Sequence, residues 1–245
     1  MFRIASEIRE SYNFNAVGIS AAGVIDNINM EVIRAAPTIK NYVGTNFKKD
    51  FGDRLGVDVY VDNDVNCALL GEQWLGGAKG LDEVFCMALG TGIGGAYYLN
   101  SLPFGSNFGV GEIGASVYDV ETDTTYEQRA STIALDRKIK AEMYDGLSVI
   151  EFFDLCKRED TNALKILDEW LYEVARGIVN LLCILDPKYI VIGGAVSAQG
   201  DYLLNKLEAK VRELHPIKIN KTKFLAASLG NDAALYGAIS PFVKK

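Results

Sequence analysis

The chain has 245 residues, of which 49% are hydrophobic, so it is long enough to bury a substantial core, and we expect two lobes that share a cleft. Its formal net charge is −7, and the basic residues form no cluster apart from the terminal Lys244 and Lys245. Because phosphate-backbone binding rests on clustered lysines and arginines, we expect no nucleic-acid partner.

The numbers and positions of the cysteines and the histidine exclude further classes of catalytic and metal site. The 4 cysteines lack the paired spacing of zinc or redox sites, so we expect buried free thiols. The single histidine, His215, precedes Pro216 in a polar connection, which makes Ser/His/Asp catalysis and histidine-based metal sites poor candidates. Arg3 and Glu7 interrupt any apolar signal segment, and no run reaches the ~20 apolar residues of a membrane span. A reducing cytoplasm without a membrane partner fits best.

Helical and strand-like patterns alternate along the chain. The first helix places Ile4, Ile8 and Tyr12 on one face, and the longest helix has Thr161 as its expected cap, with Asp186 and Pro187 ending it. The expected elements are helix 1–12, strand 16–20, strand 57–61, helix 65–75, strand 83–89, strand 96–99, helix 162–185 and strand 189–192. Strands 83–89 and 96–99 flank a glycine-rich turn and form a hairpin. This order implies a largely parallel α/β core.

The glycine-rich segments allow more than one interpretation. Gly90, Gly92 and Gly95 satisfy the spacing G-x-G-x-x-G, but a strand follows them where a dinucleotide-binding fold requires a helix. A hairpin whose backbone N–H groups and Thr91 hydroxyl hold phosphate oxygens remains, beside the alternative of an ordinary tight turn. The Gly193-Gly194 pair after strand 189–192 is similar: it is a simple turn or a bare surface for a nucleotide.

Acidic residues follow strand 57–61. Asp62, Asn63 and Asp64 lead directly into helix 65–75, so a carboxylate stands at a strand end, where a cleft edge is expected. Asp64 is either a helix cap or a proton acceptor, and a lone aspartate at this position is usually a cap.

Seven segments together resemble the ROK family (repressors, uncharacterised reading frames and sugar kinases), and within it the bacterial glucokinase and β-glucoside kinase group. They span nearly the whole chain: GISAAGVID, VDNDVNCALLGE, LGTGIGG, GEIGA, YEQRAST, IVIGGAVS and LGNDAALYGAI. The resemblance implies an α/β, actin-like ATPase (RNase H-like) two-lobed fold. Residues 1–80 plus 231–245 would form a small lobe that is incomplete at its N-terminus, and residues 81–230 the large lobe.

The resemblance also implies an ATP-dependent sugar kinase with Mg²⁺ as cofactor. Asp64 looks like the catalytic base, which takes the proton from a hexose or β-glucoside hydroxyl, usually O6, as it attacks the γ-phosphate. The other implied roles are sugar binding for Asn63, Glu112 and Glu127, phosphate binding for Gly90, Thr91, Gly92 and Gly94, and adenosine binding for Gly193 and Gly194. A homodimer is expected by the same resemblance.

Three departures from the family pattern qualify these expectations. Ala115 stands where many members have a histidine that supports the sugar and a zinc ion, and residues 116–126 contain neither Cys nor His, so we expect no zinc. The chain also lacks the opening hairpin with Asp-x-Gly-Gly-Thr, which holds ATP phosphates in the family. We expect a truncated gene model or fragment, an unpaired edge on strand 16–20, and weak or absent kinase activity.

Two alternatives to a hexose kinase remain open. A sugar-sensing or regulatory relative would bind ligand without turnover. An N-acetylhexosamine kinase of the same family would differ only in its sugar pocket, which the sequence does not distinguish.

Overall fold

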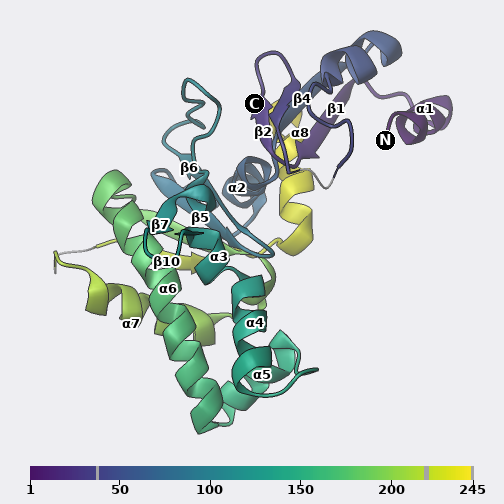
Figure 1. The fold of residues 1–245 in the computed structure, drawn as a ribbon. Coiled ribbons are helices and arrows are strands. Elements are labelled where there is room, and N and C mark those ends of the chain that lie inside the picture. Colours follow the sequence, from purple (N-terminus) through teal and green to yellow (C-terminus); the bar gives the residue numbers. More distant parts are fainter. Residues whose placement is uncertain (37–38, 218–220, 244–245) are drawn as a thin grey trace. The chain divides into compact units, whose positions relative to one another are not determined.

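The computed structural model describes residues 1–36, 39–217 and 221–243, so the basic pair 244–245 lies outside the described residues (Figure 1). The chain divides into two compact units. Unit 1 comprises Met1–Leu81, Ser101–Val110 and Ser228–Lys245, and unit 2 comprises Asp82–Asn100 and Gly111–Ala227. Ser101–Val110, which the sequence division assigned to the large lobe, belongs to unit 1.

Unit 1 is built around a parallel strand pair, β1 (Ala16–Ala21) and β4 (Asp58–Asn63), in register from Ala16 opposite Asp58 to Ala21 opposite Asn63. Within the described residues β1 pairs with β4 alone, so its other edge carries no strand there. Other elements of the unit are α1 (Phe2–Ser11), β2 (Val24–Asp26), β3 (Glu31–Arg34), a π-helical segment (Lys48–Asp53), α2 (Asp64–Leu75) and α8 (Ala233–Val243) (Figure 1).

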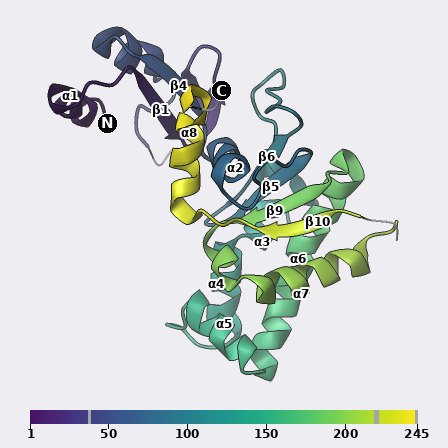
Figure 2. The same ribbon diagram turned by 180° about the vertical axis from the view of Figure 1, so that it is seen from behind.

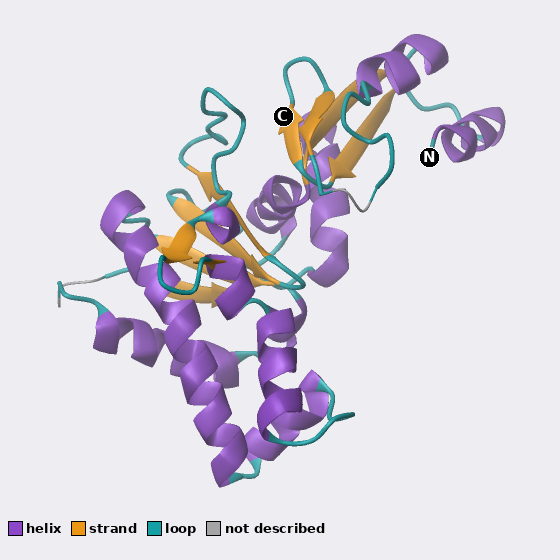
Figure 3. Cartoon of the chain, viewed as in Figure 1, coloured by secondary structure: helices purple, strands orange, loops and turns teal. Residues whose placement is uncertain are grey.

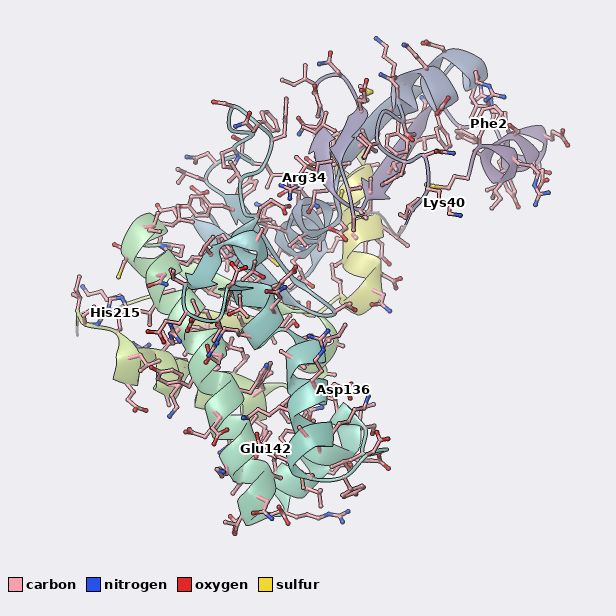
Figure 4. All side chains as sticks on the ribbon, in the orientation of Figure 1. Phe2, Arg34, Lys40, Asp136, Glu142 and His215 are labelled. Carbon is pink, nitrogen blue, oxygen red and sulfur yellow. The ribbon has the colours of Figure 1, made fainter. Side chains whose placement is uncertain are left out.

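Helix α1 turns a different face to the core from the one that its sequence suggests. Ile4, Ile8 and Tyr12, the expected apolar face, are all exposed. Phe2, labelled in Figure 4, instead packs edge-to-face on Phe51 with ring centroids 5.9 Å apart. Residues outside the isoleucine stripe therefore attach this helix to the core of unit 1.

Helices α2 and α8 pack at very close range because glycines face the neighbouring backbone. A Cβ atom built on Gly237 of α8 would overlap the carbonyl oxygen of Cys67 in α2, and one on Gly71 would overlap the carbonyl oxygen of Ala233. Any side chain at either glycine would separate the two helices, and α2 would then lose the support that fixes its position.

Unit 2 contains a sheet with the order β10-β9-β5-β6 among the described residues, in which β10, β9 and β5 are parallel and β6 is antiparallel to β5 (Figure 2). Its strands are β5 (Val84–Leu89), β6 (Ile93–Tyr98), β9 (Tyr189–Gly193) and β10 (Lys223–Ala226), with a small hairpin of β7 (Val117–Asp119) and β8 (Thr124–Thr125). Its helices are α3 (Tyr126–Ala130), α4 (Thr132–Glu142), α5 (Val149–Lys157), α6 (Thr161–Leu185) and α7 (Asp201–Leu214) (Figure 3).

The long helix α6 supplies the centre of the unit 2 core. Trp170, Val174 and Ile178 are buried at one-turn intervals along one face, as the apolar periodicity predicts. The Trp170 indole N–H donates to the carbonyl oxygen of Ala130 at 3.0 Å, which satisfies its only polar group. Replacement of this tryptophan by alanine typically costs about 3–5 kcal/mol of folding free energy.

Two sequence expectations are wrong in detail. The cap of α6 is Asp160, whose carboxylate accepts from the Ala163 N–H at 2.9 Å, while Thr161 is the first helical residue. Cys67, Cys86 and Cys156 are buried, but Cys183 is exposed because it lies on the outer face of α6.

In the described ranges, no helix combines the length and apolar character that crossing a membrane requires.

Candidate active site

The candidate base stands at the junction of β4 and α2 in unit 1. Asn63 is the helix cap, because its Oδ1 accepts from the Val65 N–H at 2.8 Å and from the Asn66 N–H at 3.4 Å. Its Nδ2 donates to the carbonyl oxygen of Gly23 at 2.9 Å, which ties the glycine corner after β1 to the same point. The cap alternative for Asp64 is therefore wrong, since the adjacent asparagine caps the helix.

Asp64 is the first residue of α2, and its side chain is exposed. The surrounding protein removes part of the water around the carboxyl and raises its pKa above the ordinary range of aspartate. Hydrogen bonding opposes this shift, mainly from the Val65 N–H, which donates to Oδ1 at 2.9 Å. A carboxylate with a raised pKa that remains accessible is a better proton acceptor near neutral pH than an ordinary aspartate.

A buried carboxylate lies beneath this junction, and from the sequence it was named only as one of the acids at the strand end, with no role of its own. Asp62 is 1% exposed and accepts four hydrogen bonds, two at each oxygen. Its donors come from β4, α2 and the turn after β2: Asn27 Nδ2, Tyr60 Oη, Asn63 N–H and Asn66 Nδ2. Burial and the neighbouring Asp62 charge raise the pKa of the Tyr60 hydroxyl, so that it stays protonated and donates.

The glycine hairpin of unit 2 connects β5 to β6. The Gly90 N–H donates to the carbonyl oxygen of Gly92 at 3.0 Å, which closes a tight turn around Thr91. Thr132, at the start of α4, donates its N–H to the Gly90 carbonyl at 2.9 Å and its hydroxyl to the Leu89 carbonyl at 3.3 Å. Sequence reasoning gave Thr132 no function, because only the fold brings α4 to this turn.

Glu127 lies against the same hairpin. Its Oε2 accepts from the Ile93 N–H at 3.3 Å, and a Cβ atom at Gly92 would lie 2.5 Å from that oxygen. The structure therefore brings a residue predicted to bind sugar directly to the turn predicted to bind phosphate. It also explains the glycine at position 92, where any side chain would displace the carboxylate.

The GEIGA segment packs on β6 through two further glycines. A Cβ atom on Gly111 would overlap the Gly95 carbonyl oxygen, and one on Gly114 would overlap the Ile93 carbonyl oxygen. Between them Glu112 is exposed on the loop that leads into a short 3₁₀ turn. The hairpin and Glu112 are thus fixed to each other within unit 2.

The glycine pair that ends β9 lies beside the base of the hairpin. Gly194 adopts φ +88°, a conformation that favours glycine, and a Cβ atom there would overlap the carbonyl oxygen of Leu89 at the end of β5. At Gly193, a Cβ atom would meet the Met87 carbonyl oxygen only at 3.9 Å. Both glycines therefore stand at the carboxyl ends of parallel strands, where α/β sheets bind ligands.

The predicted residues form two clusters, one in each unit. The unit 1 cluster consists of Asn63 and Asp64. The unit 2 cluster gathers around the carboxyl ends of β5 and β9 and consists of Gly90, Thr91, Gly92, Gly94, Glu112, Glu127, Gly193 and Gly194. The lone histidine belongs to neither: His215 follows α7, and its Nδ1 accepts from the Ile217 N–H at 3.0 Å (Figure 4).

The described residues bring together few side chains suited to binding a metal ion. Residues 117–125, which lie in the segment where the family resemblance implies a zinc loop, form the β7–β8 hairpin, and the expectation of no zinc stays a prediction. Within the described ranges no group of three or more His, Cys, Asp or Glu side chains could hold a metal ion. Mg²⁺ in phosphoryl transfer needs only one or two carboxylates because nucleotide phosphates and waters complete its shell, so the expected Mg²⁺ does not require such a group and stays a prediction.

The ROK family model matches residues 2–245. This chain belongs to the ROK family. It is 28% identical to a glucokinase of Thermotoga maritima, covering 96% of this chain and 81% of that protein. It is 26% identical to a β-glucoside kinase of Listeria monocytogenes, covering 97% and 82%.

Solved structures agree with this assignment. A ROK family glucokinase from Streptomyces griseus, in complex with glucose and AMPPNP, superposes with a TM-score of 0.81 at 28% identity, covering 96% of this chain and 85% of that one. A ROK family transcriptional regulator homologous to the E. coli MLC protein has a TM-score of 0.82 at 17% identity, covering 97% and 65%, and shows the fold alone. The predicted actin-like ATPase fold and the ROK resemblance are confirmed.

Proposed function

We propose that this chain is an ATP-dependent sugar kinase that phosphorylates the O6 hydroxyl of a hexose or β-glucoside, with Asp64 as general base. The observation that carries the proposal is the accessible Asp64 carboxylate at the first turn of α2, with its pKa raised by desolvation. The names of the curated relatives, glucokinase and β-glucoside kinase, support the substrate class.

In the proposed reaction Asp64 accepts the proton of the sugar hydroxyl. At the same time the hydroxyl oxygen of the sugar forms a bond to the γ-phosphorus of ATP. The bond from that phosphorus to the bridging oxygen breaks, and ADP leaves with the electron pair. Mg²⁺, bound through the phosphates, would neutralise charge that develops during transfer. The glucose and AMPPNP of the Streptomyces griseus complex are the corresponding ligands of a relative.

The sugar hydroxyls would be held by Asn63, Glu112 and Glu127. Glu127 uses Oε2 for the Ile93 N–H, and among the described residues its Oε1 accepts no hydrogen bond, so it is available to a hydroxyl. Asn63 already uses its Oδ1 and one Nδ2 hydrogen for structure, and its side chain also hydrogen-bonds the Asp64 carboxylate, so a sugar hydroxyl would share or replace that contact.

The nucleotide would be held mainly by backbone. Gly90, Thr91, Gly92 and Gly94 would contact the phosphates through exposed backbone and the Thr91 hydroxyl, and the Gly193-Gly194 pair would lie near adenosine. Thr132 supports this assignment because it anchors the Leu89 and Gly90 carbonyls and so holds the turn in place, although the Gly90 N–H already donates to the Gly92 carbonyl. A homodimer stays a prediction for this family member.

A coupled assay for ADP formation, run with a panel of hexoses, β-glucosides and N-acetylhexosamines, tests the proposal. Sugar-dependent ADP release is expected, at the low rate predicted above for this chain, and 6-deoxyglucose should give none, because it lacks the accepting hydroxyl. Release with N-acetylhexosamines alone would place the chain in the alternative kinase class. Calorimetric sugar binding without any turnover would favour a sensor, for which the fold of the MLC-like regulator is the supporting observation.

A further inference from the structure

Asp62 is a buried acid with no cationic partner among its hydrogen-bond donors. All four donors are neutral: a tyrosine hydroxyl, one backbone N–H and two asparagine amides. A carboxylate buried in this way needs every donor, because burial makes each unmet hydrogen bond costly. The charge also lies before the first turn of α2, where the positive end of the helix dipole favours it.

The two oxygens of Asp62 have different neighbours. Oδ1 accepts from the Asn63 N–H at 2.7 Å and from Asn66 Nδ2 at 2.8 Å, both in the segment that opens α2. Oδ2 accepts from Tyr60 Oη at 2.9 Å and from Asn27 Nδ2 at 3.1 Å. The carboxylate therefore joins the opening turn of α2 to β4 and to the turn after β2. Asp64 lies inside the segment held by Oδ1, between Asn63 and Asn66.

We propose that Asp62 is a positioning residue for phosphoryl transfer: by holding Asn63 and Asn66 it fixes the direction in which the Asp64 carboxylate points. This inference rests on the proposed function. Displacement of a reacting group by about 1 Å can cost about 10²-fold in rate, so a small rotation of this turn would be visible in turnover.

The unpartnered Oδ1 of Asn27 provides a specific means to test the hydrogen bonds apart from the charge. This atom is buried and has no hydrogen-bond partner in the described residues. In an Asp62→Asn variant, Asn27 can turn its amide so that this oxygen accepts from the new Nδ2, while the new Oδ1 keeps its bonds to Asn63 and Asn66. The conservative variant should therefore retain the geometry that Asp62→Ala destroys.

Glu72 supplies a matched control from the other end of α2. It is also 1% exposed, and its carboxylate accepts from the N–H groups of Gly77, Ser228 and Leu229 at 2.7–2.8 Å. Glu72→Ala removes a buried acid of similar bonding from α2, the helix that carries Asp64, but about two turns away from Asp64. It measures what general loosening of α2 does to turnover.

The test compares kcat and the KM for ATP of the full chain with those of Asp62→Ala, Asp62→Asn and Glu72→Ala. We expect kcat to fall about 10²-fold in Asp62→Ala, with the KM for ATP within about twofold, and to stay within about tenfold of the original in Asp62→Asn. Glu72→Ala should lower the unfolding temperature with a change in kcat of less than about threefold.

Equal losses of kcat in Asp62→Ala and Glu72→Ala, or an unchanged kcat in Asp62→Ala, would overturn the positioning role and leave the kinase proposal standing. Absence of turnover in the unmodified chain would overturn the kinase proposal and this inference with it.

If Asp62→Ala does not fold, Asn66→Ala removes a single donor at Oδ1. It should lower kcat at least fivefold, and an unchanged value would contradict the proposal.

Discussion

The two clusters are constructed in opposite ways. The unit 1 cluster is made of side chains, with Asp64 exposed and Asn63 and Asp62 engaged in hydrogen bonds beneath it. The unit 2 cluster is made mainly of backbone, with glycines at positions 92 and 194 where a Cβ atom would meet a carboxylate or a carbonyl oxygen. The proposed chemistry in unit 1 therefore depends on functional groups, whereas the close packing of the unit 2 cluster depends on the absence of side chains at these glycines.

This contrast predicts different failures on mutation. An isosteric change in unit 1 should remove function and leave the fold, since the shape is kept. Addition of one methyl group to a close-contact glycine in unit 2 should damage the fold itself, because backbone atoms cannot move away easily.

The largest effect is expected at Asp64. Asp64→Asn keeps the shape of the side chain but removes the proton acceptor, so kcat should fall by about 10²–10⁴-fold while sugar affinity changes little. The control Asp58→Asn changes an exposed aspartate at the opposite end of β4 and should leave kcat unaltered. Equal activity of the Asp64→Asn variant in the coupled assay would contradict the role of this residue as base.

The next effect is on folding of unit 2. Gly194→Ala meets both a positive φ of +88° and the Leu89 carbonyl oxygen, and should lower the free energy of unfolding by more than about 2 kcal/mol. Gly146 also has a positive φ, +99°, but a Cβ atom added there would have no atom within 4 Å. The Gly146→Ala variant therefore measures the cost of the backbone conformation alone. Equal unfolding temperatures for the two variants would mean that the close approach of β9 to β5 is unimportant.

A smaller effect is expected for sugar affinity. Glu127→Gln keeps an oxygen for the Ile93 N–H but loses the charge that strengthens a bond to a hydroxyl, and should raise the sugar Kd about tenfold. Nucleotide affinity should change little. Isothermal titration of both ligands, with Glu121→Gln as an exposed control in the same unit, measures this. A shift confined to nucleotide would mean that Glu127 serves the phosphate turn alone.

The smallest effect concerns pH. Because the pKa of Asp64 is raised in the folded chain, its contribution to stability declines as the pH rises from the unfolded value of about 3.9 through the raised folded value. Asp64→Asn removes this penalty, so it should unfold at a slightly higher temperature than the original at pH 7 and at the same temperature near pH 3. The reverse order at pH 7 in differential scanning calorimetry would contradict the direction of the shift.

Local sequence signals predicted much of the fold. Strand β4 leading into α2, the β5–β6 hairpin and the 25-residue helix α6 follow from periodicity and from glycine positions that act within a few residues. The apolar stripe of α1 was less informative, because the stripe of Ile4 and Ile8 is exposed. Periodicity shows which residues share a face, but the packing of α1 on Phe51 depends on tertiary contacts.

The supporting residues of the site were beyond local signals. Thr132 reaches the Gly90 carbonyl from a helix about 40 residues further along the chain, and Asn27 reaches Asp62 from a turn 35 residues earlier. Neither residue type nor spacing marks such contacts. That Asn63 caps the helix, although only Asp64 was considered for that role from the sequence, likewise depends on side-chain direction, because both residue types are favoured caps.

The central claim is transfer of phosphate to a sugar with Asp64 as the base. Its most direct test is ³¹P NMR of the products formed from ATP, Mg²⁺ and glucose or a β-glucoside by the original chain, Asp64→Asn and Asp58→Asn. We predict a phosphate monoester resonance coupled to the two C6 protons with the original chain and with Asp58→Asn, and its loss with Asp64→Asn. A monoester formed equally by Asp64→Asn, or only inorganic phosphate from the original chain, would contradict the account.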